Sequence, residues 1–364
     1  MKSRAATDYE YLVARTGRDS ADRMVALGYI EPDDPRGPQD SSFKREAKSS
    51  SSQPRLVTKD AIRSRRMNRL PHPLPYQGSK RSLAPQIAPM VPRNVACWYE
   101  PFAGSAALTL WAASENVASR YVIADSLGPL AQLWTEIIER PDEVSARYRS
   151  VWEAQERSGS DYFNRVRERY NDHLDPVDLM YLVCRCVKNA VRFNAAGKFT
   201  QSVDKRRLGM RPEKMQAAVF GASHLLKGKT EVRVGDWLKT TADAKVADFI
   251  YMDPPYLGTT VGRDKRYASQ LALVSLIGGL ESLLARNVRF ILSYDGMTGG
   301  KTYGDPLPQR LGLEHLHLDA GRSSQATLVG RDDRTIESLY LSPGLASPAP
   351  GTPSQTSFSF ALAS

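Results

Sequence analysis

The sequence predicts an α/β fold in which helices cover both faces of a mostly parallel β-sheet. Short apolar segments with the length of buried strands alternate with longer segments whose apolar residues recur at helical spacing. Two of the apolar segments end in turns that contain Gly or Pro, as expected where the strands of such a sheet bind ligands. Hydrophobic residues make up 41% of the 364 residues, which is enough for a core and excludes wholesale disorder.

Four strands are expected, and helices lie between them. The strands are residues 94–102, Tyr121–Asp125, 247–256 and 288–295. The helices are residues 106–113, 128–140 and, between the last two strands, 268–287. Because strands that alternate with helices pair in parallel, both faces of the sheet are expected to be buried.

Residues 141–230 depart from this alternation. Helices are expected first, at residues 143–157, 161–174 and 176–191. The chain then becomes polar, and from Arg185 to Lys214 nine Lys or Arg residues stand against two acidic residues. We interpret residues 141–230 as a recognition domain inserted into an α/β domain that is formed by residues 71–140 and 231–341.

The two ends of the chain have the composition of appendages. Residues 1–70 are expected to form an extension with a basic linker, since residues 44–69 contain nine Lys or Arg and two acidic residues. This linker is either a solvated tether or an arm that holds phosphates. Residues 342–364 are of low complexity, and we expect them to be disordered.

The charge balance favours a polyanionic partner. The 50 Lys and Arg and 40 Asp and Glu residues give a net charge of +10, typical of nucleic-acid binding, although ribosome-like or membrane-surface binding stays open. No apolar run approaches the roughly 18–20 residues of a membrane span. Cys97, Cys184 and Cys186 are too few and too irregularly placed for a disulfide framework or a four-ligand zinc site. We therefore expect a cytosolic protein without a metal.

A Gly-containing loop follows the first expected strand. Glu100 and Phe102 precede Gly104, and a helix comes directly after the loop. A Gly at this place allows a ligand to approach backbone N–H groups near the positive end of a helix. Asp125 ends the second strand 21 residues after Gly104, where a carboxylate would hold a ribose diol. The pair fits any Rossmann-like nucleotide binder, and a surface Asp beside an ordinary turn is the alternative.

The most specific motif is Asp253-Pro254-Pro255-Tyr256, directly after the apolar residues 249–252. Two prolines can neither donate to a sheet nor continue into a helix, so they form a rigid corner. The corner fixes a carboxylate and an aromatic ring at the carboxyl end of a strand, where ligands of such sheets bind.

Such a corner is suited to the methylation of an exocyclic amine on a base. The lone pair of this amine is delocalised into the ring, so the nitrogen is a poor nucleophile. The carboxylate of Asp253 and the carbonyl of Pro254 can accept both amine hydrogens, and the base can stack on Tyr256. Positioning and electrostatics would then supply the rate without a metal or a covalent intermediate.

Two weaker motifs accompany this corner. Tyr76-Gln77-Gly78-Ser79-Lys80 precedes the first strand, and Lys80 is suited to a cofactor carboxylate while Tyr76 can cover a ring. Asp236-Trp237 precedes the third strand, where the Asp can accept from the amino group of an adenine ring. A solvated basic turn and an exposed turn Asp are the respective alternatives.

Taken in this order, the motifs resemble those of the Dam-like (D12 class) DNA adenine-N6 methyltransferases of the restriction-modification type. The resemblance covers residues 74–342. The segment from Asn189 to Phe199 looks like the family's Asn-Gly-x-x-Arg-Tyr-Asn-x-x-Gly-x-Phe stretch. The chain departs from the family in having Ser79 and Ala106 where a Gly is usual.

The resemblance implies a Rossmann-like methyltransferase fold with an inserted helical target-recognition domain. It also implies S-adenosylmethionine as methyl donor and duplex DNA as partner. The enzyme would be cytoplasmic and nucleoid-associated, and a cognate restriction endonuclease would act on the same DNA site without forming a stable complex with it. The implied catalytic residues are Asp253, Pro254, Pro255 and Tyr256. The implied cofactor-binding residues are Tyr76, Lys80, Glu100, Phe102, Gly104, Asp125, Asp236 and Trp237.

An adenine amine inside a duplex is paired and stacked, so the base must be swung out, at a cost of a few kcal/mol. Contacts to phosphates and groove edges must offset this cost, and the basic part of the insertion can supply them. The candidates for DNA binding are Lys188, Arg192, Asn194, Lys198, Lys205, Arg206, Arg207 and Arg211.

Three alternatives stay open. Ribosomal RNA guanine-N2 methyltransferases can share the Gly-containing loop and the Asp-Pro-Pro-Tyr corner, but the 149 residues from Gly104 to Asp253 and the Tyr76–Lys80 element favour DNA. Cytosine-N4 transfer more often has a corner that begins with Ser. A DNA-binding protein with an inactive methyltransferase fold is the third, and the intact Asp253 corner argues against it. A phage or solitary enzyme is also compatible with the sequence.

Overall fold

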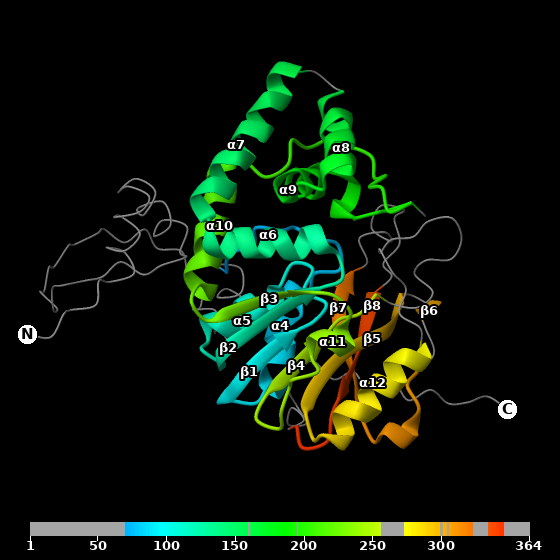
Figure 1. Ribbon diagram of the computed structural model, residues 1–364. Coiled ribbons are helices and arrows are strands. Elements are labelled where there is room, and N and C mark those ends of the chain that lie inside the picture. Colours follow the sequence, from blue (N-terminus) through cyan, green and yellow to red (C-terminus); the bar gives the residue numbers. More distant parts are fainter. Residues whose placement is uncertain are drawn as a thin grey trace, which may run out of the picture. The chain divides into compact units, whose positions relative to one another are not determined.

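A mixed β-sheet with helices on both faces lies within residues 71–364 of the protein, as seen in a computed structural model (Figure 1). The structure describes residues 70–158, 161–194, 196–255, 273–298, 301–303, 306–322 and 334–345. The chain divides into two units, residues 1–70 and 71–364. The extension up to residue 69, Tyr256 and residues 346–364 of the tail lie outside the described residues.

The strands follow the order β3-β2-β1-β4-β5-β8-β7 across the sheet, and β6 pairs with β5. Neighbouring strands from β3 to β5 run parallel, whereas β8 is antiparallel to both β5 and β7. The strands are β1 (Val95–Glu100), β2 (Ala118–Asp125), β3 (Thr230–Val234), β4 (Phe249–Met252), β5 (Arg289–Thr298), β6 (Lys301–Tyr303), β7 (Glu314–Arg322) and β8 (Arg334–Leu341). The predicted α/β fold with a mostly parallel sheet is confirmed.

The four predicted strands correspond to β1, β2, β4 and β5, and the structure adds four more. The edge strand β3 has the sequence Thr-Glu-Val-Arg-Val and is only partly buried, so it lacks the apolar run of a central strand. The antiparallel strands β7 and β8 likewise mix polar and apolar residues. Apolar runs identified the strands that are buried on both faces and did not identify the others.

Side chains alternate between two buried faces along the central strands. In β1, Cys97 and Tyr99 join a core cluster with Trp237 of α11 (Trp237–Thr240) and Leu280 of α12 (Leu273–Ala285). Trp98 points to the other face and donates from Nε1 to Thr109 Oγ1 of α5 (Ala107–Ser114), at 3.0 Å. Helices therefore cover both faces, as the sequence predicted.

The side of the sheet that bears α5 also carries α6 (Gly128–Glu139) and α10 (Pro212–Leu226), because α10 contacts both other helices. The helices α7 (Pro141–Ser158), α8 (Tyr162–His173) and α9 (Pro176–Arg185) gather beyond α6 and α10, at the top of Figure 1. Short helical turns, including α4 (Ala84–Ile87), precede β1.

The start of α9 shows how the sequence defines the helical segment. Asp175 caps this helix by accepting from the backbone N–H groups of Val177 (2.9 Å) and Asp178 (3.1 Å), and Pro176 occupies the first helical position. The buried carboxylate of Asp178 is bound by Arg169 of α8, with Nε 2.6 Å from Oδ2. The helices α7, α9 and α10 also contact α6, so the segment packs directly on the α/β part. Its role as an inserted recognition domain stays a prediction.

Three features of the described residues concern membranes, metal ions and cysteines. None of their helices has the length and apolar character that crossing a membrane requires. Among the same residues, no three His, Cys, Asp or Glu side chains are grouped in a way that could hold a metal ion. The cysteines Cys97, Cys184 and Cys186 are buried free thiols.

The contact between α11 and α12 requires a glycine at one position. A Cβ at Gly279 would lie 2.4 Å from ring atoms of the buried Trp237, whereas a Cβ at Gly278 would meet nothing within 4 Å. We expect Gly279→Ala to lower the free energy of unfolding by about 1–3 kcal/mol through overpacking. Gly278→Ala, the matched control, should raise it by up to about 1 kcal/mol because Ala favours a helix. Urea unfolding measures both, and equal stabilities of the two variants would contradict this packing.

Candidate active site

A pocket lies where the order of the sheet reverses. The chain passes from β1 outward to β2 and β3 and returns to place β4 on the other side of β1. The crevice outside the carboxyl ends of strands at such a reversal is the usual ligand site of open α/β sheets. The pocket has about 1010 Å³ of space, including the part that opens to solvent.

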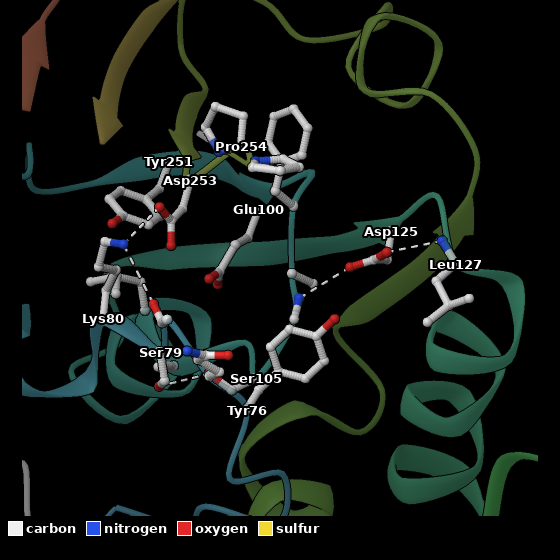
Figure 2. A pocket seen from close by; sticks show the side chains of 18 of the residues that line it. Tyr76, Ser79, Lys80, Glu100, Ser105, Asp125, Leu127, Tyr251, Asp253 and Pro254 are labelled. Carbon is white, nitrogen blue, oxygen red and sulfur yellow. Dashed lines mark hydrogen bonds and ion pairs between the residues drawn. The ribbon is translucent and has the colours of Figure 1, made fainter. Parts of the chain in front are cut away.

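The pocket brings together nine of the residues that the sequence predicted for the site. They come from the segment before β1, from the ends of β1 and β2 and from the turn after β4 (Figure 2). These residues are Tyr76, Lys80, Glu100, Phe102, Gly104, Asp125, Asp253, Pro254 and Pro255. The predicted Tyr256 lies outside the described residues.

The loop after β1 has a left-handed backbone at two positions. Gly104 has a φ of +48°, and an added Cβ would lie 3.5 Å from the ring of Tyr76. Ala106, where the family usually has Gly, has a φ of +47° and precedes α5 as its N-cap residue. The indole of Trp134 donates to the carbonyl of Gly104 at 3.0 Å. The loop is thus tied to α6 while its backbone faces the pocket.

Asp125, at the end of β2, is hydrogen-bonded to the loop after β1 and to the turn after β2. Its Oδ2 accepts from the N–H of Gly104 at 3.2 Å, and its Oδ1 accepts from the N–H of Leu127 at 2.9 Å (Figure 2). Burial raises the pKa of Asp125, and these backbone hydrogen bonds oppose the shift. A carboxylate has about four acceptor positions, so Asp125 can also accept from a ligand hydroxyl group.

Glu100 ends β1 on the α5 face and is buried, with 4% of its surface exposed. Its Oε2 accepts from the backbone N–H of Thr109 at 2.7 Å and also from the Thr109 hydroxyl. Burial raises the pKa of Glu100 to about 8, although the hydrogen bonds from Thr109 act in the opposite direction. Glu100, which the sequence predicted to bind the cofactor, is therefore largely neutral near pH 7.

The ammonium of Lys80 lies among acidic groups at the corner after β4. Its Nζ is 2.9 Å from Oδ1 of Asp253 and 3.7 Å from Oε2 of Glu337, and it lies 3.4 Å from the carbonyl of Gly78. The sequence predicted that Lys80 would pair with a cofactor carboxylate, and the structure gives it these protein partners. Figure 2 shows Lys80 and Asp253 pointing toward one another.

The Tyr76–Lys80 element is fastened to the loop after β1 and to the segment after α9. The hydroxyl of Ser105 donates to Ser79 Oγ at 2.8 Å (Figure 2). Ser79, which stands where a Gly is usual, therefore links this element to the loop after β1. The N–H of Gln77 donates to the carbonyl of Asn189 at 3.0 Å. Phe193, near Asn189 in the chain, lines the pocket and packs edge-on against Phe199 with a centroid distance of 5.9 Å.

Asp236 and Trp237 are not part of the pocket lining. Asp236 caps α11 by accepting from the N–H of Leu238 at 2.9 Å. The ring of Trp237 is buried between the sheet and α12, 6.1 Å from the ring of Phe102. The structure accounts for both residues through capping and core packing, and their contact with a cofactor stays a prediction.

The eight candidates for DNA binding fall into three groups. Arg206 and Arg207 are ion-paired with the buried Asp204, whose pKa is lowered to about 2 chiefly by its hydrogen bond with Arg206. Arg207 also donates to the carbonyl of Cys186 at 2.9 Å, so it stabilises the loop from within the protein.

In the part of the chain that the structure describes, the exposed side chains of Lys188, Lys198, Lys205 and Arg211 form no ion pair. The half-buried Arg192 and the exposed Asn194 lie beside Phe193; Oδ1 of Asn194 accepts from the N–H groups of Ala196 and Lys198, both at 3.0 Å.

The pocket residues that the sequence did not assign to the site include Tyr251, Phe193 and Glu337. Tyr251 lies two residues before Asp253 in β4, so strand alternation was an available signal for it. Phe193 belongs to the motif-like stretch after Asn189 but was not assigned to the pocket. Glu337 lies on β8, an antiparallel strand 84 residues after Asp253, and no local pattern marks it.

Comparison with known protein families identifies the family of this chain. The family model of the D12 class N6 adenine-specific DNA methyltransferases matches residues 76–294. The chain belongs to this family. The matched region begins at Tyr76 and ends in β5, so it includes the loop after β1, Asp125, the helices α7–α10 and the corner at Asp253.

The relatives of the chain include modification methylases and DNA adenine methylases. Modification methylase LlaI of Lactococcus lactis subsp. lactis is 25% identical over 202 residues, which are 52% of this chain and 30% of that protein. Modification methylase StsI of Streptococcus sanguinis is 27% identical over 256 residues, 63% of this chain and 36% of that protein. The chain thus spans about a third of these methylases. The DNA adenine methylase of Escherichia coli (strain K12) is 26% identical over 295 residues, 76% of this chain and 97% of that protein.

The buried Glu100 should make stability depend on pH. Its folded pKa of about 8 lies above its ordinary value of 4.5, so its contribution to stability is complete below pH 4.5 and is lost as the pH rises through 8. Glu100→Gln stays neutral and should flatten this decline by up to about 1.4 kcal/mol per pH unit between these limits. Urea unfolding at pH 5, 7 and 9 tests this. An unchanged pH dependence in the variant would mean that Glu100 is ionised in the folded protein.

Proposed function

We propose that this protein transfers a methyl group from S-adenosylmethionine to the N6 amine of an adenine that is flipped out of duplex DNA. The observation that carries the proposal is the convergence of the Asp253 corner and the Gly104 loop on one pocket at the reversal of the sheet. Membership of the D12 class and similarity to DNA adenine methylase support it.

Asp253 and Pro254 would act on the target amine. The amine has two hydrogens, and the Asp253 carboxylate and the Pro254 carbonyl can each accept one. This localises the lone pair on nitrogen and directs it at the methyl group. The rigid Pro254-Pro255 corner holds both acceptors without reorganisation during the reaction. Asp253 is a strand-end residue with a 20% exposed side chain, so its acceptor strength is only partly weakened by water.

The pocket residues fit the proposed methyl donor. S-adenosylmethionine would supply an electrophilic methyl group on a sulfonium. Asp125 would accept from the ribose hydroxyl groups, and the backbone at Gly104 would allow the close approach that a side chain would block. The ring of Tyr76, which lies against Gly104, would cover one face of the bound ligand. Glu100 and Phe102 complete this wall of the pocket.

Residues 141–230 would form the inserted target-recognition domain of a catalytic domain that consists of residues 71–140 and 231–341. Phe193 supports this assignment, because it brings the basic loop of this segment to the edge of the pocket. The exposed Lys188, Lys198, Lys205 and Arg211 would contact phosphates, whereas Arg206 and Arg207 would shape the loop. The modification methylases among the relatives favour a restriction-modification setting, with an endonuclease that acts on the same DNA site.

Replacement of Asp253 tests the proposed chemistry. We expect Asp253→Ala and Asp253→Asn to lower the rate of methyl transfer at least about 100-fold, because the acceptor for the amine hydrogen is lost or weakened. DNA affinity should change little, since the carboxylate does not contact phosphates. Labelled methyl transfer to mixed-sequence duplex DNA gives the rate, and mass spectrometry of the nucleosides identifies the product. Substantial activity in either variant, or a product on guanine N2 or cytosine N4, would refute the assignment.

The exposed lysines of the basic loop can be tested through salt. We expect Lys205→Ala to weaken duplex binding for all sequences and to reduce the slope of log K against log salt concentration by about 1. The control is Lys239→Ala, which removes an exposed lysine of α11 outside the loop and should leave the slope unchanged. Fluorescence anisotropy at several salt concentrations gives both slopes. Equal slopes in the two variants would exclude Lys205 from the DNA surface.

A further inference from the structure

A second carboxylate reaches the Lys80–Asp253 pair from the antiparallel part of the sheet. Oε2 of Glu337 is 3.7 Å from Nζ of Lys80, while Oδ1 of Asp253 is 2.9 Å from the same nitrogen. All three side chains are largely buried, with exposed fractions of 7% for Lys80, 20% for Asp253 and 16% for Glu337. One buried ammonium is therefore divided between two carboxylates, one of which is the proposed acceptor for the target amine.

A bulge in β5 determines where Glu337 lies. Ser293 pairs with Leu339 and Gly296 pairs with Glu337, so β5 has one extra residue between these pairs. Gly296 has a φ of +154°, and an added Cβ would lie 2.7 Å from the carbonyl oxygen of Ile336. The bulge therefore depends on a glycine and fixes the path of β8 beside Glu337.

Strand alternation directs Glu337 to the pocket face. Leu339 lies opposite Ser293, whose hydroxyl is 2.9 Å from the hydroxyl of Tyr251, a residue of the pocket wall. Glu337 is two residues from Leu339 and hence on the same face. It belongs to the pocket lining together with Asp253.

The division of the ammonium has a consequence for the reaction. A carboxylate oxygen that is bound by a lysine is a weaker acceptor for an amine hydrogen than one that is not, because the positive charge withdraws electron density from it. In a largely buried site this effect is strong, and removal of one carboxylate strengthens the hold of the other on the ammonium. The position of Lys80 between Asp253 and Glu337 thus controls how well Asp253 can accept.

We propose that Glu337 is a positioning residue for the methyl transfer: it draws the Lys80 ammonium away from Asp253 when the target amine binds, so that Asp253 is released to accept the amine hydrogen. This inference rests on the proposed function. Lys80 orients the Asp253 carboxylate before the base arrives and moves toward Glu337 afterwards. Glu337 acts through Lys80 and does not touch the substrate.

The test uses Glu337→Gln, which keeps the size of the side chain and removes its charge. Because Asp253 would then be the stronger of the two partners of Lys80, kcat at saturating DNA and methyl donor should fall roughly 10- to 100-fold, as when a reacting group is misplaced. KM for the donor and Kd for DNA should change by less than about threefold, because binding contacts are kept. Glu337→Asp, which retains the charge on a shorter stem, should recover part of kcat. The control is Glu281→Gln on the surface of α12, which should behave as wild type.

A double-mutant cycle separates positioning from a structural role. In a Lys80→Met background, Glu337→Gln should change kcat by less than about twofold, because no ammonium remains to be shared. The inference is overturned if the Glu337→Gln loss is the same in both backgrounds, or if this variant retains wild-type kcat. Wild-type protein that methylates no adenine would overturn the proposed function itself, and with it this inference. Urea unfolding of each variant shows whether the fold is retained.

Discussion

The reversal of strand order beside β1 is the constraint on which the site depends. Because β4 returns to lie next to β1, the carboxyl ends of β1, β2 and β4 meet at one crevice. Each of these ends carries an acidic residue: Glu100, Asp125 and Asp253. The alternation of side chains in the buried strands then determines which face each residue occupies, so the topology places the chemistry before any loop contributes.

Four acidic groups and one lysine around a single pocket are costly unless their charges are compensated, and the structure does this in three ways. Glu100 avoids its charge near neutral pH because burial raises its pKa to about 8. Asp125 accepts two backbone N–H groups. Asp253 and Glu337 share the ammonium of Lys80. Burial therefore favours the neutral form of Glu100, whereas Asp253 and Glu337 have a cationic partner, and this separates the roles that the carboxyl groups can take.

The sequence was sufficient for the central strands, for their helices and for nine residues of the pocket, and the reason is physical. Buried strands show as apolar runs, and the Pro254-Pro255 corner and Gly104 act through local backbone geometry that sequence records directly. Lys80 was placed in the site, but its partners were not predicted, since they come from β4 and β8. For Asp236 the sequence left a ligand contact and an exposed turn equally open, and the structure shows it capping α11. Glu337 depends on a bulge in β5 and on strand pairing, which no local pattern encodes.

The central claim is that Asp253 binds the amine of an extruded adenine. A crystal structure of the protein with duplex DNA and a non-transferable analogue of S-adenosylmethionine tests it most directly. We expect an adenine outside the helix with its N6 at a hydrogen-bonding distance of about 2.6–3.2 Å from a carboxylate oxygen of Asp253. An adenine that remains stacked in the duplex, or a base bound elsewhere while Lys80 still holds Asp253, would contradict the account.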